Sequence, residues 1–443
     1  MAALAGFTNI GKVPELRRRI IFTLIVVAIY RVGVFVTTPG VDRVVMHQVV
    51  KGQGGILGLL NVFSGGALAN LSIFALGIMP YVSASIIMQL MGLVSKQVEE
   101  LKKEGEAGRR KLEQWTRYGA VALSCFQAFG VAMMLEGMNN SDLGMGRNGD
   151  VVTSPGWGFR LLTIITLTTG ASLLMWLGEQ ATERGVGNGV SMIIFASIVS
   201  GIPGGIMSYW QGTGGDIQPL NVAVLLGVLL ISIAVVVFFE RAQRQIPIQY
   251  SRRQVGRRVY GGQTAHLPLK VNMASMIPPI FASSLLMFPA TLANMNIPGM
   301  QVFSALLNRG DWLFHALFAT LIIFFTFFYT AVTFQPVEVA DNLKKQQANI
   351  PGIRPGRQTA EYIDRVLTRL TTGGAIYIAV ICTVPSLVAQ SFHIPFQFGG
   401  TTLIIVVGVA LETVSQIEAH LITRSYEGLT GPRMTRLSGR RPA

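Results

Sequence analysis

Ten long apolar runs, separated by shorter polar segments, dominate the pattern of this 443-residue chain. A helix needs about 20 mostly apolar residues to cross the hydrocarbon core of a bilayer. Lipid offers the backbone no hydrogen-bond partners, so each run is expected to be helical. The pattern predicts transmembrane helices at 20–38, 72–94, 118–135, 158–177, 189–208, 219–239, 272–292, 312–334, 372–390 and 401–421.

The composition excludes an ordinary water-soluble protein. Hydrophobic residues make up 50% of the chain and charged residues only 13%, whereas a soluble domain carries about 25% charged residues. The first run follows the basic triplet Arg17–Arg19, as the core of a signal peptide would. No small-residue cleavage pattern follows it and nine further runs do, so we interpret it as a retained span.

Lysine and arginine predict the orientation. With a cytoplasmic N-terminus, 30 of the 36 Lys and Arg residues fall in cytoplasmic segments, five fall on the opposite side, and Arg31 lies within the first span. Cytoplasmic loops of membrane proteins are enriched in these residues. We therefore predict that both termini are cytoplasmic, with a short segment at 1–19 and a basic tail at 422–443.

The spans divide into two sets of five, at 20–210 and 211–421. An odd number in each set means that the second set enters the membrane upside down relative to the first. An odd number of spans in each half is typical of inverted repeats, whose functional site lies between the halves.

The sequence contains no enzyme motif. We find neither a phosphate-binding GxxxxGK[ST] loop nor an HExxH zinc helix, and we expect no catalytic residue, metal or cofactor. Ionisable residues within spans are few, with Arg31 and Glu412 the clearest. Arg31 is expected to snorkel or to bind a backbone carbonyl. A secondary transporter would need coupled carboxylates at the midplane, so that alternative is weakened but stays open, as does a scaffold without a pore.

The glycine-rich stretch at 52–72 is too broken to span and too apolar for an exposed loop. It is either a mobile element hinged onto the second span or an interfacial loop, and composition alone does not separate the two. Pro80 lacks an amide hydrogen and is expected to kink the second span.

Two long basic loops, at 241–270 and 335–369, interrupt the second set of spans. Topology alone makes loops on this side basic, but it needs only a few charges close to the membrane. We therefore favour docking of a large anionic partner. The pairs Ile78/Val82 and Ile194/Ile198 have i, i+4 spacing, and periodicity alone assigns them to a core or lipid-facing surface.

Several long strings resemble the SecY/Sec61-alpha family in order and over about residues 10 to 425: NVFSGGALANLSIFALGIMPYVSASIIMQL, KKEGEAGRRKLEQWTRYG, MWLGEQATERGVGNGVSMIIF, HLPLKVNMASMIPPIFASS, ADNLKK with PGIRPGRQTAEYIDRVLTRLT, and FGGTTLIIVV. The resemblance implies an all-α integral membrane protein with ten transmembrane helices in two inverted five-helix halves around a central pore. It also implies a passive channel that passes unfolded secretory polypeptides and releases membrane segments sideways into lipid.

The resemblance also implies roles for individual residues. The ring that narrows the family's pore matches Ile78, Val82, Ile194, Ile198, Ile280 and Ile405. The plug matches about residues 60–72, including Phe63, Ser64, Gly65, Gly66 and Asn70. Ser83 and Phe288 match positions that face each other across a lateral gate between the second and seventh spans. Partner docking maps to Arg252, Arg253, Arg257, Arg258, Arg354 and Arg357.

Partners and location follow from the same resemblance. It implies the SecE and SecG subunits, the SecA motor or a translating ribosome contacted through its RNA, SecDF and YidC, signal peptides and nascent chains, and anionic lipid. The location it implies is the bacterial cytoplasmic (inner) membrane. The chain departs from common family residues at Val82, Asn70 and Val337. The waist is therefore expected to be slightly looser and one contact at Val337 to be missing or moved, while the polar contacts of the plug at Asn70 stay open.

Overall fold

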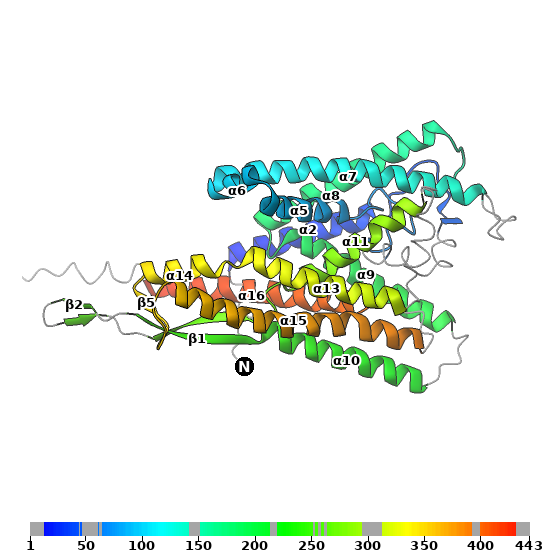
Figure 1. The fold of residues 1–443 in the computed structure, drawn as a ribbon. Coiled ribbons are helices and arrows are strands. Elements are labelled where there is room, and N and C mark those ends of the chain that lie inside the picture. Colours follow the sequence, from blue (N-terminus) through cyan, green and yellow to red (C-terminus); the bar gives the residue numbers. More distant parts are fainter. Residues whose placement is uncertain are drawn as a thin grey trace, which may run out of the picture.

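The computed structural model describes residues 13–43, 45, 46, 61, 64–140, 151–212, 219–250, 253–255, 258–260, 264–294, 312–391 and 399–430. Long helices lie side by side along one direction (Figure 1). The first five are α2 (Pro14–Gly33), α5 (Met79–Val94), α7 (Glu106–Asn140), α8 (Trp157–Arg184) and α9 (Gly189–Gly212). The second five are α10 (Pro219–Arg241), α11 (Ile277–Asn294), α13 (Trp312–Thr333), α15 (Arg357–Ser391) and α16 (Gly400–Thr430).

Each predicted span contains one of these helices. Within the described residues, six segments are long and apolar enough by length and composition to cross a membrane, and shorter apolar helices run over Gly189–Gly204 and Ile277–Leu286. The outer surface of the bundle is also apolar: on α10, Leu230 is 64% exposed and Phe238 is 68% exposed. A water-soluble surface rarely shows such a patch, so the chain is a multi-pass membrane protein.

Three predicted boundaries are wrong, and in each case the structure replaces helix by turns or extended chain. The first helix ends at Gly33 rather than at 38, the second begins at Met79 rather than at 72, and the seventh begins at Ile277 rather than at 272. Pro80 lies in the first turn of α5, where its missing amide hydrogen breaks no helical bond. The predicted kink at Pro80 is therefore wrong, because this proline begins a helix instead of bending one.

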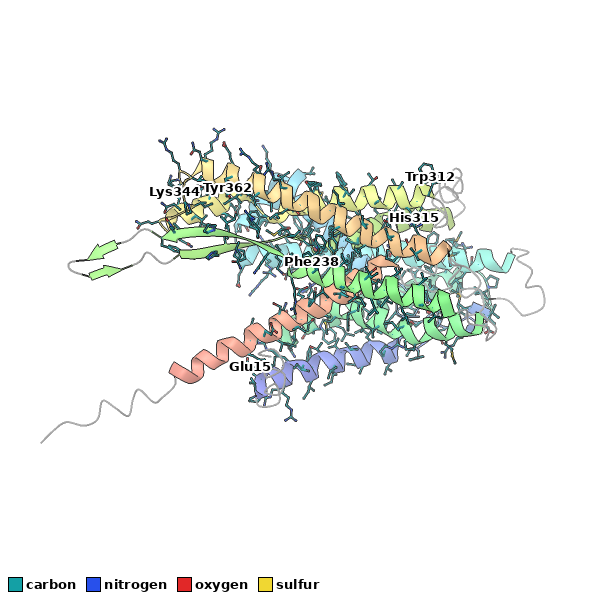
Figure 2. All side chains as sticks on the ribbon, turned by 90° about the horizontal axis from the view of Figure 1, so that it is seen from below. Glu15, Phe238, Trp312, His315, Lys344 and Tyr362 are labelled. Carbon is teal, nitrogen blue, oxygen red and sulfur yellow. The ribbon has the colours of Figure 1, made fainter. Side chains whose placement is uncertain are left out.

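Other elements gather at one end of the bundle, which we call the loop end (Figure 1). These are α6 (Lys96–Lys103), α14 (Pro336–Lys345) and the strands β1 (Gln243–Tyr250), β2 (Arg253–Val255), β3 (Arg258–Tyr260), β4 (Thr264–Lys270) and β5 (Ala348–Asn349). Figure 2 shows Lys344 and Tyr362 at this end and Trp312 at the opposite end. The spans are helical as predicted, and the strands belong to the basic loops between them.

The two sets of five helices pack mainly within themselves. In the first set, α8 contacts α2, α5, α7 and α9; in the second, α15 contacts α10, α13 and α16. The sets meet where α9 packs on α16 and where α11 packs on α5 and α7. Because these two seams lie on different helices, an enclosed space remains between the sets.

Candidate functional site

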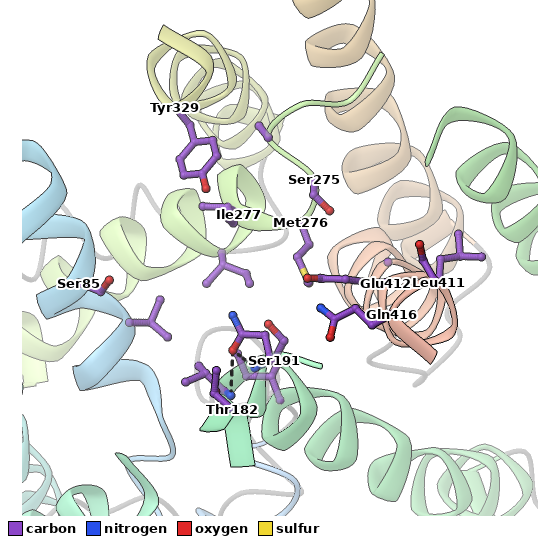
Figure 3. A pocket seen from close by; sticks show the side chains of 18 of the residues that line it. Ser85, Thr182, Ser191, Ser275, Met276, Ile277, Tyr329, Leu411, Glu412 and Gln416 are labelled. Carbon is purple, nitrogen blue, oxygen red and sulfur yellow. Dashed lines mark hydrogen bonds between the residues drawn. The ribbon is translucent and has the colours of Figure 1, made fainter. Parts of the chain in front are cut away.

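A cavity of about 1270 Å³ occupies the space between the two sets of helices. Figure 3 looks into it: Ser85, Thr182 and Ser191 come from the first set, and Tyr329 and Glu412 come from the second. Its lining includes Arg109, Gln243 and Lys270 beside the elements of the loop end, together with several carboxylates. The cavity is thus a polar vestibule on the side of the bundle that carries the basic loops.

Three of the six residues of the predicted ring line this cavity, and the other three are buried in the bundle. Val82, Ile194 and Ile280 line it. Ile78, Ile198 and Ile405 are only 5%, 0% and 0% exposed, and they lie in the same hydrophobic cluster. The lining of the vestibule thus includes aliphatic side chains from both halves, beside a hydrophobic cluster that contains the other three predicted ring residues. Such a surface repels water and ions while making no directional bonds.

The two i, i+4 pairs in the ring differ in their local structure. Ile194 and Ile198 lie within α9, as their spacing predicts. Ile78 is instead the residue before α5, and its carbonyl accepts the first helical hydrogen bond from the Val82 amide at 3.1 Å. Ile78 is therefore held at the junction between α5 and the turns that precede it.

The predicted plug is described at Asn61 and from Ser64 onward, and we call residues 64–72 the plug segment; Phe63 lies outside the described residues. Gly65 and Gly66 have φ of +62° and +85°, in the left-handed region that favours glycine. A Cβ on Gly65 would lie 2.9 Å from the Ser197 Cα atom, whereas one on Gly66 would meet nothing within 4 Å. The plug segment thus touches α9 at a point where only glycine fits.

Asn70 has polar partners, although it stands where related chains often carry a basic residue. Its Oδ1 accepts a 3.0 Å hydrogen bond from Arg43 Nε, and its Nδ2 donates to the Gly66 carbonyl at 3.2 Å. The side-chain amide therefore ties the plug segment to itself and to the chain after α2.

Four polar side chains around the plug segment escaped prediction as site residues. Tyr30 and Arg31 on α2 donate to the carbonyls of Ser64 and Gly65, and Ser197 and Ser200 on α9 bond to the same two side chains. The expectation that Arg31 binds a backbone carbonyl is confirmed. The available signal was the pair of serines three residues apart in an otherwise apolar span, which places both on neighbouring parts of one helix face.

The predicted lateral gate lies at the seam where α11 packs on α5 and α7. Ser83 is on α5 and Phe288 is on α11, but the side chain of Phe288 lies outside what the structure describes, so their facing arrangement stays a prediction. The chain before α11 is fixed by Asn272, whose Nδ2 donates to Glu240 Oε1 at 2.7 Å and to the Ser275 carbonyl at 3.2 Å. Ser275 itself has a φ of +49°.

The two basic loops form one structure. Strand β1 of the first loop pairs with β5 of the second, with Gln249 opposite Asn349 and Tyr250 opposite Ala348, and the sheet order is β4-β1-β5. Apolar side chains from both loops fill a small core beneath it, namely Ile246, Ile248, Leu269, Leu343, Ile350 and Ile363. We call this unit the loop platform.

Two of the predicted docking arginines, Arg354 and Arg357, lie beside this platform, and two others lie in a separate hairpin. Arg354 and Arg357 are exposed, and the Arg357 Nε atom donates to Glu361 at 3.0 Å. Arg253 and Arg258 belong to the β2–β3 hairpin, where Arg258 pairs in register with Val255; Arg252 and Arg257 lie outside the described residues. Val337, on α14, is 64% exposed, so an apolar side chain lies on the surface of the platform.

Another element of the loop end, α6, carries its own ion pair. The Lys103 ammonium donates a 2.7 Å hydrogen bond to Glu99, and this contact holds the pKa of the Glu99 carboxyl below its ordinary value. Both side chains are exposed, so the pair adds little to stability. Among the described residues, no three His, Cys, Asp or Glu side chains are grouped to hold a metal ion.

The bundle and its cavity define a class: a multi-pass α-helical membrane protein in which two sets of five helices line a common vestibule. A profile of the SecY family matches residues 72–414. The chain is 48% identical to protein translocase subunit SecY of Rickettsia typhi over 421 residues, covering 94% of this chain and 96% of the relative. It is also 48% identical to protein translocase subunit SecY of Escherichia coli K12 over 425 residues, covering 94% of each. The chain belongs to the SecY family.

Solved structures share the fold. One, described as a protein conducting channel, matches with a TM-score of 0.63 at 16% identity and covers 93% of this chain and 96% of its own. Another, described by the plug domain of the SecY protein, also has a TM-score of 0.63, at 18% identity and the same coverage. A third is Sec61 in the canine ribosome-channel complex, with a TM-score of 0.58 and 16% identity.

Proposed function

We propose that this chain is the pore-forming subunit of a protein-conducting channel. It passes unfolded secretory polypeptides through the membrane and releases apolar segments sideways into lipid. The observation that carries the proposal is the polar vestibule of about 1270 Å³ between the two halves of the bundle, whose lining includes the aliphatic side chains of Val82, Ile194 and Ile280. The chain acts as a channel subunit and not as an enzyme.

The ring suits a substrate of any sequence. Ile78, Val82, Ile194, Ile198, Ile280 and Ile405 offer only non-directional contacts, so a moving chain loses no specific bond as each residue passes. Aliphatic side chains around a narrow opening also keep it dry when it is empty. The same six residues thus block water and ions when the channel is empty and pack around the polypeptide during transport. The plug segment adds a second barrier to water and ions.

Movement of the substrate requires a partner. We infer that the loop platform docks the SecA motor or a ribosome, with Arg354 and Arg357 and the arginines of the β2–β3 hairpin as contacts. Arginine binds carboxylates and phosphates through its planar fork, and ribosomal RNA adds a dense array of phosphates. SecE and SecG are the expected membrane subunits. The 30 basic residues predicted for this side support a bacterial inner membrane location with both termini in the cytoplasm.

Reconstituted transport tests this proposal. The chain, purified with its membrane subunits, is placed in lipid vesicles with SecA, ATP and an unfolded precursor. We expect the precursor to become protected from added protease, and this protection should require both SecA and ATP. Uptake of a small solute driven by an ion gradient, without partner and without precursor protection, would instead support a secondary transporter.

A further inference from the structure

The plug segment is attached to its surroundings in two different ways. At residues 71–73 the backbone bonds to the extended chain after α2: the Thr38 amide donates to the Leu71 carbonyl at 2.8 Å, and the Ile73 amide donates to the Val36 carbonyl at 3.0 Å. At Ser64 and Gly65 the attachment is made by two side chains of α2, Tyr30 and Arg31, which in turn bond to serines of α9. One end is therefore anchored by backbone, and the other is held by groups that rotamer changes can release.

The side-chain end is a closed hydrogen-bond network. Ser197 Oγ bonds to the Tyr30 hydroxyl at 2.7 Å, and that hydroxyl donates to the Ser64 carbonyl at 2.7 Å. Tyr30, Ser64 and Ser197 are 1%, 3% and 2% exposed. Because buried polar groups are costly when they lose a partner, this arrangement favours the docked position of the plug segment.

A second pair of bonds runs parallel to the first. Arg31 Nη1 donates to the Gly65 carbonyl at 3.0 Å and to Ser200 Oγ at 2.9 Å, while Ser200 donates onward to the Ser197 carbonyl at 2.7 Å. An arginine within a span is costly unless it is satisfied. Departure of the plug segment would remove one acceptor from Arg31, so the charge itself opposes departure.

Helix α9 connects this network to the ring. Ile194 and Ile198 of the ring and Ser197 of the network lie within one helical turn of each other, and residues three or four apart are neighbours on a helix surface. A displacement of α9 that widens the ring therefore pulls Ser197 and Ser200 away from Tyr30 and Arg31. The backbone anchor at 71–73 involves no residue of α9, so it would persist.

We propose that Tyr30 and Arg31 are positioning residues that latch the plug segment to α2 while Ser197 and Ser200 of α9 orient them, so that widening of the ring weakens this latch and lets the plug move. The inference rests on the proposed channel function and deepens it, because it names the groups that set the closed position. The latch releases at Ser64 and Gly65, and the plug then swings on its anchor at 71–73.

Removal of two latch bonds tests this inference. Tyr30→Phe deletes the hydroxyl while it keeps the ring that stacks on Phe74 at 5.9 Å between centroids, and Ser200→Ala deletes the acceptor of Arg31. The full chain with its membrane subunits is reconstituted in a planar bilayer, and the resting conductance is measured. We expect Tyr30→Phe to raise it about fivefold, the change that corresponds to losing a buried hydrogen bond, and the double variant to raise it further.

A matched control separates a latch from a general defect. Tyr377→Phe removes a hydroxyl that is also buried but has no hydrogen-bond partner, and it should leave the conductance unchanged. Deletion of residues 61–70 retains the anchor at 71–73 and should raise the conductance by itself. In that background Tyr30→Phe should add nothing, because there is no plug left to hold, and precursor transport should persist in every variant.

The outcomes distinguish the latch from the proposed function. A rise on deletion without a rise for Tyr30→Phe would overturn the latch and leave the channel standing. Equal effects of Tyr30→Phe with and without residues 61–70 would also overturn it, since they would indicate loss of packing elsewhere. No rise in either variant would contradict both the latch and the sealing role of the plug, whereas precursor transport tests the channel separately.

Discussion

The ring and the plug contacts share helix α9 but use opposite chemistry. Ile194 and Ile198 contact their neighbours through apolar surface alone, whereas Ser197 and Ser200 take part in directed hydrogen bonds with Tyr30 and Arg31. Apolar contacts give way gradually and re-form around any shape. Directed bonds fix one geometry and are lost over a small displacement. One helix thus combines a seal that adapts to its substrate with a second contact that reports whether the seal is closed.

The largest effect on resting conductance is expected when a polar side chain replaces an apolar residue of the ring. Ile198→Asn places an amide in a position that is 0% exposed. An unpaired buried amide costs about 1–3 kcal/mol, so water entering the constriction would be favoured and the resting conductance should rise more than about tenfold. The matched control is Val199→Asn on the same helix, where the side chain is 36% exposed. Equal conductance in the two variants would show that Ile198 does not face the barrier.

A smaller effect is expected at the contact between the plug segment and α9. Gly65→Ala and Gly66→Ala both place a side chain at positive φ, at a cost of about 1–2 kcal/mol each. Only the first also forces a Cβ to within 2.9 Å of the Ser197 Cα atom. We expect Gly65→Ala to conduct about fivefold more than Gly66→Ala in planar bilayers. The same conductance for both would mean that close packing on α9 does not hold the plug.

The smallest effect is expected at the loop platform, where charges are exposed. Arg354→Glu should weaken SecA binding about threefold at low salt, and the loss should shrink as salt screens the contact. Binding is measured by titrating labelled SecA onto vesicles that contain the complex. Arg369→Glu makes the same charge change at an exposed position of α15 and serves as the control. A loss independent of salt, or equal in both variants, would argue against a charged contact at Arg354.

The spans and their order could be predicted from sequence because the period and length of apolar runs carry that information. The positions where helices begin or end within the apolar segments could not be predicted. Residues 72–78 are as apolar as the helix that follows them, and residues 272–276 carry no proline or glycine to mark a turn. Tertiary contacts, such as the Asn272 amide on Glu240, favour the turns at 272–276. The effect of Pro80 could not be predicted either, because a proline in an apolar run is compatible with both a kink and a helix start.

The candidate site was also predictable from sequence only in part. Periodicity marked Ile194 and Ile198 only as buried or lipid-facing, and the resemblance to a family was needed to connect them with Ile280 and Ile405, more than 80 residues away along the chain. The link between the two basic loops, made by β1 and β5, has no local sequence signal. Arg31 was recognisable as unusual in a span, but its partners Gly65 and Ser200 are brought to it only by the packing of α9 on α2.

Site-specific crosslinking of a stalled substrate tests the central claim most directly. The native Cys125 and Cys382 are first replaced by serine and alanine, and single cysteines are then introduced at Ile194, Ile280 or Phe238. A secretory precursor is arrested midway by a folded domain at its C-terminus. The account predicts crosslinks from the arrested segment to positions 194 and 280 and none to position 238, which faces outward from α10. Crosslinks only to position 238, or equal crosslinks to all three, would contradict a path through the ring.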